Sequence, residues 1–277
     1  MNRAFLSFII NLICLFIPAP KARRRIRQRL NKAAQRPIKI EKWREIPPIN
    51  HKEIPIYIIV FNQLSYLKKL VTFLEKCGYQ NIHFIDNLST YPPLLEYLGV
   101  TKHTVHRMDK NYGHLVFWNS GKFDTVVKDE YYVLTDPDVV PDADCPADFM
   151  RTFYEILIRA PRANKVGCAL KIDDLPDGYK HKSEVQEWES QWWKTPIEND
   201  MGLEIFDALI DTTFALYRPR RDWPGNNHLR ALRIAGKYTA RHLPWYECNA
   251  ETEEQKLYKK TSNASTTWAH ETPKIHS

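Results

Sequence analysis

Short apolar runs alternate with helix-like segments through the first half of the chain, and this alternation restricts the possible folds most. Residues 56–61 (Ile-Tyr-Ile-Ile-Val-Phe) are apolar and rich in β-branched side chains, which is typical of a buried strand. Similar runs occur at 81–86, 104–108 and 131–135. Helices are expected between the runs, from Leu64 to Gly78, at 92–98 and at 113–119. Such alternation predicts right-handed βαβ units and a mainly parallel sheet.

The second half of the chain is less regular. We expect strands at 164–172 and 212–217, a helix at 183–193, and mixed short strands and loops after Pro219. The predicted fold class is therefore α/β, with a Rossmann-like, mainly parallel sheet flanked by helices and a mixed C-terminal region. In such sheets the ligand lies outside the carboxyl ends of the strands. Polar residues follow three of these ends, at Asn62, Asp86-Asn87 and Asp136-Pro137-Asp138.

The composition supports a folded domain and argues against two classes of nucleotide-binding protein. Hydrophobic residues make up 43% of the 277 residues and charged residues 26%, so the chain can bury a sizeable core. Neither G-x-G-x-x-G nor G-x-x-x-x-G-K occurs, so a dinucleotide-binding Rossmann enzyme or a P-loop ATPase is not expected. The five cysteines include no C-x-x-C pair, which indicates a reducing compartment without a disulfide framework.

The positive charge is concentrated near the N-terminus. The formal net charge is +7, but Lys21 to Arg44 alone contributes +10, from eleven basic residues and Glu41, so the remainder carries −3. A nucleic-acid-binding enzyme usually spreads basic groups over its working face. We therefore expect no nucleic-acid partner.

The basic block follows an apolar run from Ala4 to Ile17. As a helix this run would span about 21 Å, less than the ~30 Å hydrocarbon core of a bilayer. A secretory signal peptide would carry its charge before the run, whereas here the charge follows it. We expect residues 1–30 to form a monotopic anchor at an anionic membrane surface, on the cytoplasmic face of the inner (plasma) membrane. Residues 31–53 are expected to be a linker strapped along the domain.

The most informative motif is the apolar strand that runs into Asp136-Pro137-Asp138. Two carboxylates on a tight turn at a sheet edge can hold Mg²⁺ or Mn²⁺ while a diphosphate completes the coordination shell. Asp-Pro-Asp is also common in ordinary turns. Its position after the fourth strand of an alternating pattern favours the metal site.

At this point the chain resembles a glycosyltransferase of the GT-A type that uses nucleotide-sugar donors. It is similar to bacterial enzymes that build lipopolysaccharide or capsule. The resemblance covers about residues 54–270 and rests on the strand leading to Asn62, the Asp86-Asn87 strand end, the D-x-D motif and a late histidine, His270. It implies a nucleotide-sugar-binding half at 54–145 and an acceptor-binding half at 146–277.

The resemblance also implies roles for particular residues. Asn62, Asp86, Asn87 and Asn111 would lie beside the nucleotide. Asp136 would contact the ribose and the metal, and Asp138 the metal and the diphosphate. His270 would be a further metal ligand, although it could equally be an ordinary residue of the tail.

An inverting transfer also needs a carboxylate that takes the proton of the acceptor hydroxyl. No acid-rich helix start of the kind found in many inverting members is obvious here. Asp211 is the first candidate for this base, because it precedes a strand-like run. Glu189 and Glu187 are the next, although residues two apart face different sides of a helix, so at most one can act. Asp173 and Asp174 follow them.

The expected function is that of a metal-dependent hexosyltransferase that moves a sugar from a UDP-sugar to a lipid-linked oligosaccharide. A nucleotidyltransferase is a second hypothesis, but it would carry a Gly-rich basic loop where this chain has Asn62-Gln-Leu-Ser65. A nuclease of the PD-(D/E)-x-K kind is a third, and no well-spaced acid-x-Lys follows Asp138. A non-enzymatic scaffold docked on a membrane is the fourth, and it needs no metal site.

Overall fold

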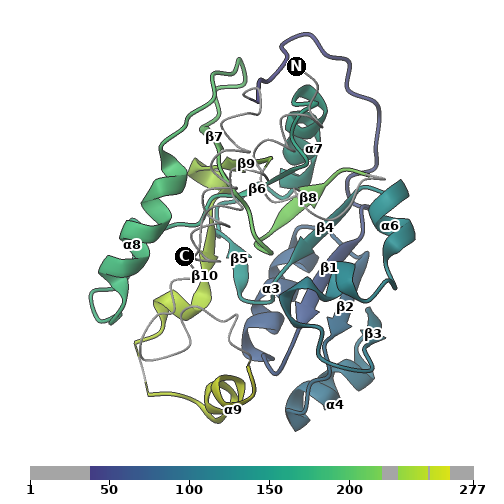
Figure 1. Cartoon of the computed structure of the whole chain (residues 1–277), viewed down its shortest axis with the longest axis vertical. Coiled ribbons are helices and arrows are strands. Elements are labelled where there is room, and N and C mark those ends of the chain that lie inside the picture. Colours follow the sequence, from purple (N-terminus) through teal and green to yellow (C-terminus); the bar gives the residue numbers. More distant parts are fainter. Residues whose placement is uncertain (1–37, 220–229, 249, 263–277) are drawn as a thin grey trace, which may run out of the picture. The chain divides into compact units, whose positions relative to one another are not determined.

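The computed structural model describes residues 38–219, 230–248 and 250–262 (Figure 1). All of these except Ile38 belong to one compact unit, Lys39–Ser265. The predicted anchor at 1–30 lies outside the described residues, as does His270. The part of the predicted linker that precedes residue 38 also lies outside them.

The centre of the fold is an eight-stranded sheet in the order β3-β2-β1-β4-β8-β6-β9-β7. Strands β3, β2, β1 and β4 pair in parallel, as do β6 and β9. Strand β8 is antiparallel to both β4 and β6, and β7 is antiparallel to β9. The predicted mainly parallel sheet is thus confirmed. The bounds are β1 (Ile56–Val60), β2 (Ile82–Asp86), β3 (Thr104–Arg107), β4 (Tyr132–Thr135), β6 (Lys165–Cys168), β7 (Ile205–Asp207), β8 (Ala215–Tyr217) and β9 (Ala231–Ile234).

Helices flank this sheet, as expected for the α/β class (Figure 1). The predicted helical segments correspond to α3 (Ser65–Lys76), α4 (Pro92–Val100), the η1 (Gly113–Leu115) and α5 (Val116–Asn119) pair, and α8 (Lys182–Ser190) with η2 (Gln191–Trp193). The structure adds helices that the sequence analysis did not predict, namely α6 (Asp124–Asp129), α7 (Phe149–Arg159), η4 (Gly236–Tyr238), η5 (Leu243–Tyr246) and α9 (Glu253–Thr261).

Strand β1 is buried along its whole length, as its apolar sequence predicts. Alternate residues of a strand point to opposite faces of the sheet. Tyr57 and Ile59 belong to a cluster that includes Phe117 and Phe123 from the α5–α6 region. Because the residues that alternate with them are buried as well, both faces of the sheet are covered at this strand.

The strand order reverses beside β1. Strands β2 and β3 lie on one side of β1, and the chain then returns to place β4 on the other side. The carboxyl ends of β1 and β4 therefore flank a topological switch point, where open α/β sheets bind their ligands. Just after β4, a second, two-stranded sheet pairs β5 (Val139–Pro141) with β10 (Ala240–His242).

Residues 39–53, here called the strap, form no helix or strand and belong to the compact unit. The Glu41 amide donates to the Arg159 carbonyl at 2.8 Å, and the Asn81 side chain donates to the Glu53 carbonyl at 2.7 Å. The predicted division of the domain into two halves near residue 145 stays a prediction.

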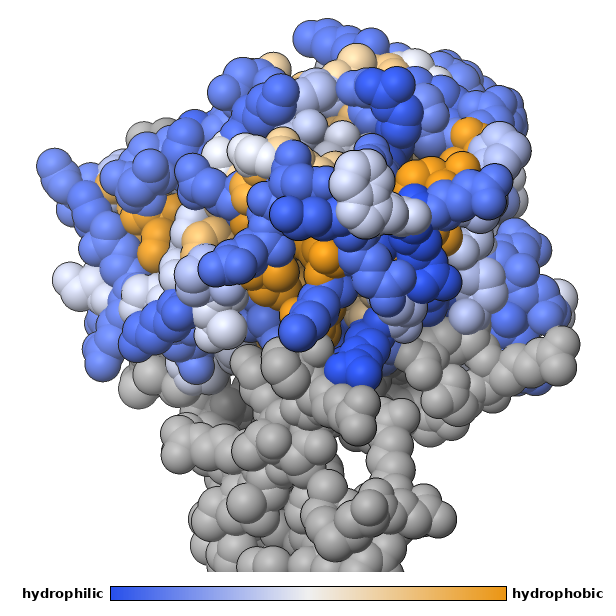
Figure 2. All heavy atoms as spheres, turned by 90° about the horizontal axis from the view of Figure 1, so that it is seen from above, coloured by the Kyte–Doolittle hydropathy of each residue, from blue (hydrophilic) through white to orange (hydrophobic). Residues whose placement is uncertain are grey.

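The face seen in Figure 2 is mainly hydrophilic, with apolar side chains visible between polar ones. Across the described ranges, the large apolar side chains that are exposed are Trp43, Leu88 and Val100. They come from separate segments of the sequence. No helix within the described part of the chain is both long enough and apolar enough to cross a bilayer.

Candidate functional site

Asn62 follows β1 and holds two neighbouring segments at the switch point. Its backbone has φ of 52°, in the left-handed region that asparagine tolerates better than most residues. Its Oδ1 accepts from the amides of Thr90 and Tyr91 at 2.7 and 3.0 Å, and its Nδ2 donates to Thr261 Oγ1 at 3.0 Å. The buried Asn62 amide is therefore engaged within the chain and fixes the loop after β2.

Asp86 ends β2 and is fully buried. Its Oδ1 accepts from the Ser89 amide at 2.9 Å, whereas its Oδ2 accepts no hydrogen bond from the described residues. Arg107 Nε lies 3.5 Å from that oxygen, and the Arg107 side chain is mostly exposed. A buried carboxylate oxygen normally has a donor. This oxygen is therefore ion-paired with Arg107 but receives no hydrogen bond from the described residues.

Asn87 contacts Asn111 at the same end of the sheet. Asn87 Oδ1 accepts from the Tyr112 amide at 2.9 Å, and its Nδ2 donates to Asn111 Oδ1 at 2.9 Å and to the Gly113 carbonyl at 3.0 Å. Gly113 has a positive φ of 73° where η1 begins. These contacts fix the segment before α5 against the end of β2.

Asp136 follows β4 and is held by Thr212. The Asp136 amide donates to the Thr212 carbonyl at 3.0 Å, and the Thr212 hydroxyl donates to Asp136 Oδ2 at 2.5 Å. Burial raises the pKa of Asp136 well above its usual range, and the charges of Asp138 and Asp211 raise it further, while the Thr212 hydrogen bond opposes the shift. The ionised form of the Asp136 carboxyl group is thus disfavoured by burial and by the neighbouring acids, and a cation bound beside it would stabilise this form.

Asp138 lies two residues further on and is buried. Its carbonyl accepts from the Leu243 amide at 2.8 Å, and its Oδ2 lies 3.5 Å from His242 Nε2. The charge of Asp138 is one of the causes that raise the pKa of Asp136.

The donor set of this turn fits a divalent cation. Two interacting carboxylates, one of them with a raised pKa, would be stabilised by a cation between them. Mg²⁺ often takes one or two protein carboxylates and fills its other positions with phosphate oxygens and water. No cluster of three or more His, Cys, Asp or Glu residues suited to a metal occurs among the described residues, and His270 lies outside them. Within the described part of the chain, the pair Asp136 and Asp138 would therefore need a phosphate ligand and water to complete the coordination of a metal.

The candidate bases differ in their exposure and in the residues that they contact. Asp211 is exposed. Its charge contributes to the raised pKa of Asp136, so Asp211 lies at the same end of the sheet. Glu189 is buried and paired with Arg233 at 2.8 Å. Glu187 is exposed on α8. Asp174 is engaged by Arg241 in an ion-pair network described below. The structure therefore brings only Asp211 of these candidates into electrostatic contact with the acid pair.

The C-terminal part of the chain supplies contacts that the sequence analysis did not find. The β5–β10 pairing brings His242 to Asp138, and no local pattern in the sequence indicates this contact. Burial raises the pKa of Tyr66, and a hydrogen bond to Glu247 raises it further. Glu254 on α9 accepts from the Ser65 amide and hydroxyl at 3.0 and 2.9 Å. Only α9 had a readable signal, the Thr252-x-x-Gln255 capping box.

Comparison with known proteins does not assign a family. No protein-family model matches the sequence, and no curated protein matches it either. The residues at the carboxyl edge of the sheet are therefore the basis on which a function can be proposed.

Proposed function

We propose that the protein is a metal-dependent glycosyltransferase of the GT-A type that moves a hexosyl group from a nucleotide-sugar donor, a UDP-sugar, to an oligosaccharide acceptor carried on a lipid. The observation that carries this proposal is the pair of interacting carboxyl groups, Asp136 and Asp138, at the end of β4 beside the switch point. Ligands bind at this position in open α/β sheets.

The neighbouring strand ends support a nucleotide beside this pair. Asp86 Oδ2 lies beside Arg107 and receives no hydrogen bond from the described residues, and it would accept one from the N–H of a base or the hydroxyl of a ribose. Asn87 and Asn111 hold the adjoining segment in one conformation through the hydrogen bond between their side chains. A preformed segment reduces the entropy that is lost when a ligand binds.

The chemistry would divide between a cation and the side chains of the chain. A bound Mn²⁺ or Mg²⁺, held by Asp136 and Asp138, would neutralise charge on the nucleoside diphosphate leaving group. Thr212 orients Asp136 through its hydrogen bond. Asp211 would take the proton from the acceptor hydroxyl as the bond between the anomeric carbon and the diphosphate oxygen breaks and the new glycosidic bond forms.

A membrane location is part of the same proposal. The apolar run and basic block of residues 1–30 would hold the enzyme peripherally on the cytoplasmic face of the inner (plasma) membrane. A protein held at the surface meets a lipid-borne acceptor at a high effective concentration.

The test is a panel of nucleotide sugars, scored by thermal unfolding with and without Mn²⁺. The true donor at a hundredfold excess over its Kd should stabilise the fold by about 2.7 kcal/mol. Asp138→Asn should abolish the Mn²⁺-dependent part of this gain. Asp129→Asn, at an exposed site on α6, should retain it. Donors identified in this way are then assayed for transfer to lipid-linked acceptors.

Other outcomes distinguish the remaining hypotheses. Stabilisation by a nucleoside triphosphate with Mn²⁺, but by no nucleotide sugar, would support a nucleotidyltransferase instead. If no nucleotide stabilises the protein under any condition, the scaffold hypothesis is favoured and the enzymatic proposal fails.

A further inference from the structure

His242 is placed at the acid pair by the small sheet. In the β5–β10 register His242 lies opposite Val139, the residue after Asp138. The Leu243 amide donates to the Asp138 carbonyl at 2.8 Å, which extends this pairing by one more contact. Backbone contacts on both sides of His242 therefore fix where its side chain can reach.

The imidazole presents Nε2 to the carboxylate. Nε2 lies 3.5 Å from Asp138 Oδ2, beyond the usual 2.7–3.2 Å of a hydrogen bond. An ionised carboxylate only accepts hydrogen bonds, so the tautomer of His242 that suits this contact has its proton on Nε2. The side chain keeps 20% of its surface exposed. His242 thus offers an N–H at the acid pair that is not fully used by the chain.

The other side of the ring argues against a metal-ligand role. The ring packs on buried Trp245 with 4.6 Å between centroids, and Nδ1 is buried without a hydrogen bond to any described residue. A histidine that binds a metal almost always donates its second ring nitrogen to a carboxylate, carbonyl or water. His242 has no such partner among the residues that the structure describes, so we expect it to donate a hydrogen bond rather than to coordinate the cation.

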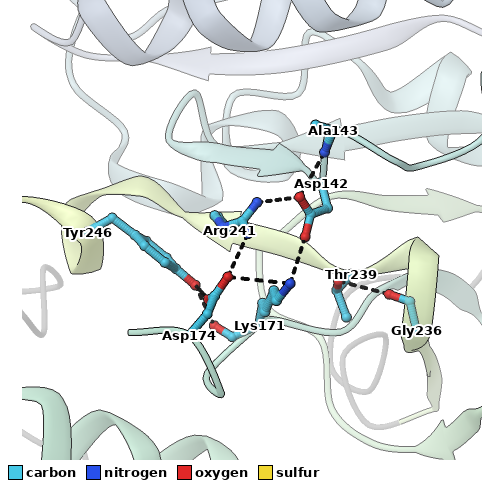
Figure 3. A network of polar contacts seen from close by, with 8 residues as sticks. All are labelled: Asp142, Ala143, Lys171, Asp174, Gly236, Thr239, Arg241 and Tyr246. Carbon is cyan, nitrogen blue, oxygen red and sulfur yellow. Dashed lines mark hydrogen bonds and ion pairs between the residues drawn. The ribbon is translucent and has the colours of Figure 1, made fainter. Parts of the chain in front are cut away.

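A charged network holds β10 on its other face. Successive residues of a strand point to opposite faces, so Arg241 and His242 diverge. Figure 3 shows Arg241 between Asp142 and Asp174, with Lys171 close to both acids and Tyr246 at Asp174. The Arg241–Asp174 and Tyr246–Asp174 contacts are both 2.6 Å, and Lys171 lies 3.1 Å from Asp142. Two acids and two bases compensate each other here, so the network can fix β10 without drawing on His242 or Asp138.

We propose that His242 donates a hydrogen bond from Nε2 to the diphosphate of the nucleotide, beside the cation held by the acid pair. This inference depends on the proposed function and names a residue that recognises its donor. The ligand chemistry is a nucleoside diphosphate, because a nucleoside without phosphates would leave this N–H unused. The 20% exposure of the His242 side chain and the 3.5 Å between Nε2 and Asp138 Oδ2 would allow a phosphate oxygen to approach this N–H.

The experiment measures binding by calorimetry in the full-length protein. The probes are UDP and uridine, each with Mn²⁺. His242→Phe keeps a ring on Trp245 but removes the donor, and it should weaken UDP binding tenfold or more, since hydrogen bonds to charged groups contribute about 1.5–3 kcal/mol. Uridine binding should stay unchanged. His242→Gln places an N–H near the position of Nε2 and should restore part of the UDP affinity.

Two controls complete the design. His51→Phe changes a histidine on the strap, which lies before β1 and therefore at the opposite edge of the sheet, and it should bind UDP like the wild type. Mn²⁺ binding without nucleotide, followed by electron paramagnetic resonance, should be equal in the wild type and in His242→Phe. Should His242→Phe fail to fold, His242→Ala takes its place and the Gln variant again tests recovery.

Each result separates the hypotheses. Unchanged UDP affinity in His242→Phe overturns the inference and leaves the proposed function standing. Loss of Mn²⁺ affinity in the absence of nucleotide also overturns it, because His242 would then be a metal ligand. A wild-type protein that binds neither UDP nor Mn²⁺ refutes the proposed function and this inference together.

Discussion

Lys165, the first residue of β6, is a buried lysine whose ammonium group has no carboxylate side chain among the described residues as a hydrogen-bond partner. Its Nζ donates to the Tyr217 hydroxyl at 2.9 Å and to the Asp211 carbonyl at 3.1 Å. Burial lowers the pKa of Lys165 to about 7, the charge of Asp211 opposes this shift, and that of Arg233 adds to it. The side chain can therefore change its charge near neutral pH within the folded protein.

This lysine should make stability depend on pH above neutrality. The unfolded chain holds the lysine proton up to about pH 10.4, whereas the folded protein loses it near pH 7. Between these values the unfolded state binds more protons, so the free energy of unfolding rises with pH, by up to about 1.4 kcal/mol per unit. Below pH 7 this contribution is flat. Lys165→Met should lack the rise.

Urea unfolding at pH 7, 8 and 9 measures the effect as the difference between wild type and Lys165→Met. Other titrating groups cancel in that difference. Lys128→Met, at an exposed site on α6, is the matched control and should track the wild type. A wild-type minus Lys165→Met difference that stays constant with pH would show that the buried amine does not titrate in this range.

Single residues of the candidate site were predictable where they end a strand. Asp86 and Asp136 follow apolar runs, and the carboxyl ends of neighbouring parallel strands necessarily meet at one edge. Thr212 and His242 were not predictable. Each reaches its acid only because distant strands pair, and nothing in the local sequence encodes that contact.

At the scale of elements, α9 caps α3. The first amides of a helix lack partners within it, and Leu64, which precedes α3, has no side-chain acceptor. Glu254 of α9 supplies the acceptor for Ser65 instead. Glu254→Ala should therefore lower the free energy of unfolding by about 1–2 kcal/mol. Glu253→Ala, at a neighbouring side chain that is 84% exposed, should cost less than about 0.5 kcal/mol in the same urea titration. Equal effects would refute the capping role.

Two histidines on neighbouring strands form a second coupled unit. His83 Nδ1 and His106 Nε2 lie 3.1 Å apart, and the rings are stacked against each other. One ring must donate and the other accept, so at least one nitrogen of the contact is unprotonated. Burial lowers the pKa of His106 to about 4, and the charges of His83 and Lys122 lower it further.

This pair should weaken the fold in acid. Between about pH 6.5 and 4, His106 is protonated in the unfolded chain but mostly unprotonated in the folded protein. The free energy of unfolding therefore falls as the pH falls. His106→Gln should lose part of this dependence and show a shallower decline. Thermal unfolding at pH 7, 6, 5 and 4.5 measures it, with His114→Gln, an exposed residue of η1, as control. Parallel declines in all three proteins would contradict the assignment.

Elements were predictable in proportion to their local signal. Strand β1 and helix α3 each show a clear spacing of apolar residues and a clear end in the sequence. The bounds of both were predicted within two residues. Helix α7 was missed although Phe149, Phe153, Tyr154 and Leu157 carry helical spacing and are buried. Strands β7 and β10 have only three residues each, so their pairing partners rather than their own sequences define them.

At the scale of the whole molecule, strand–helix alternation predicted a mainly parallel sheet and the edge at which polar residues gather. The strand order was beyond the sequence. Placing β8 between β4 and β6, with reversed direction, depends on contacts between segments far apart in the chain. The same holds for β10, which returns to the acid pair from the C-terminal part.

The uneven distribution of charge along the sequence leads to a prediction about the entire chain. The block from Lys21 to Arg44 carries +10 and the remainder −3, and only the block follows an apolar run. Each basic residue near an anionic surface contributes about 1 kcal/mol. Replacing Arg23, Arg24 and Arg25 by Gln should therefore weaken binding to phosphatidylserine-containing vesicles by about 3 kcal/mol, roughly a hundredfold.

Sedimentation with vesicles measures this binding. The wild type should sediment with anionic vesicles, less with neutral ones, and less again at high salt, because salt screens exposed charges. Lys256→Gln removes one exposed basic charge from α9 and should behave like the wild type. Deletion of residues 1–30 should release the protein into the supernatant. If the deleted protein sediments as well as the full chain, the surface that binds the membrane lies in the folded domain, and the anchor hypothesis is wrong.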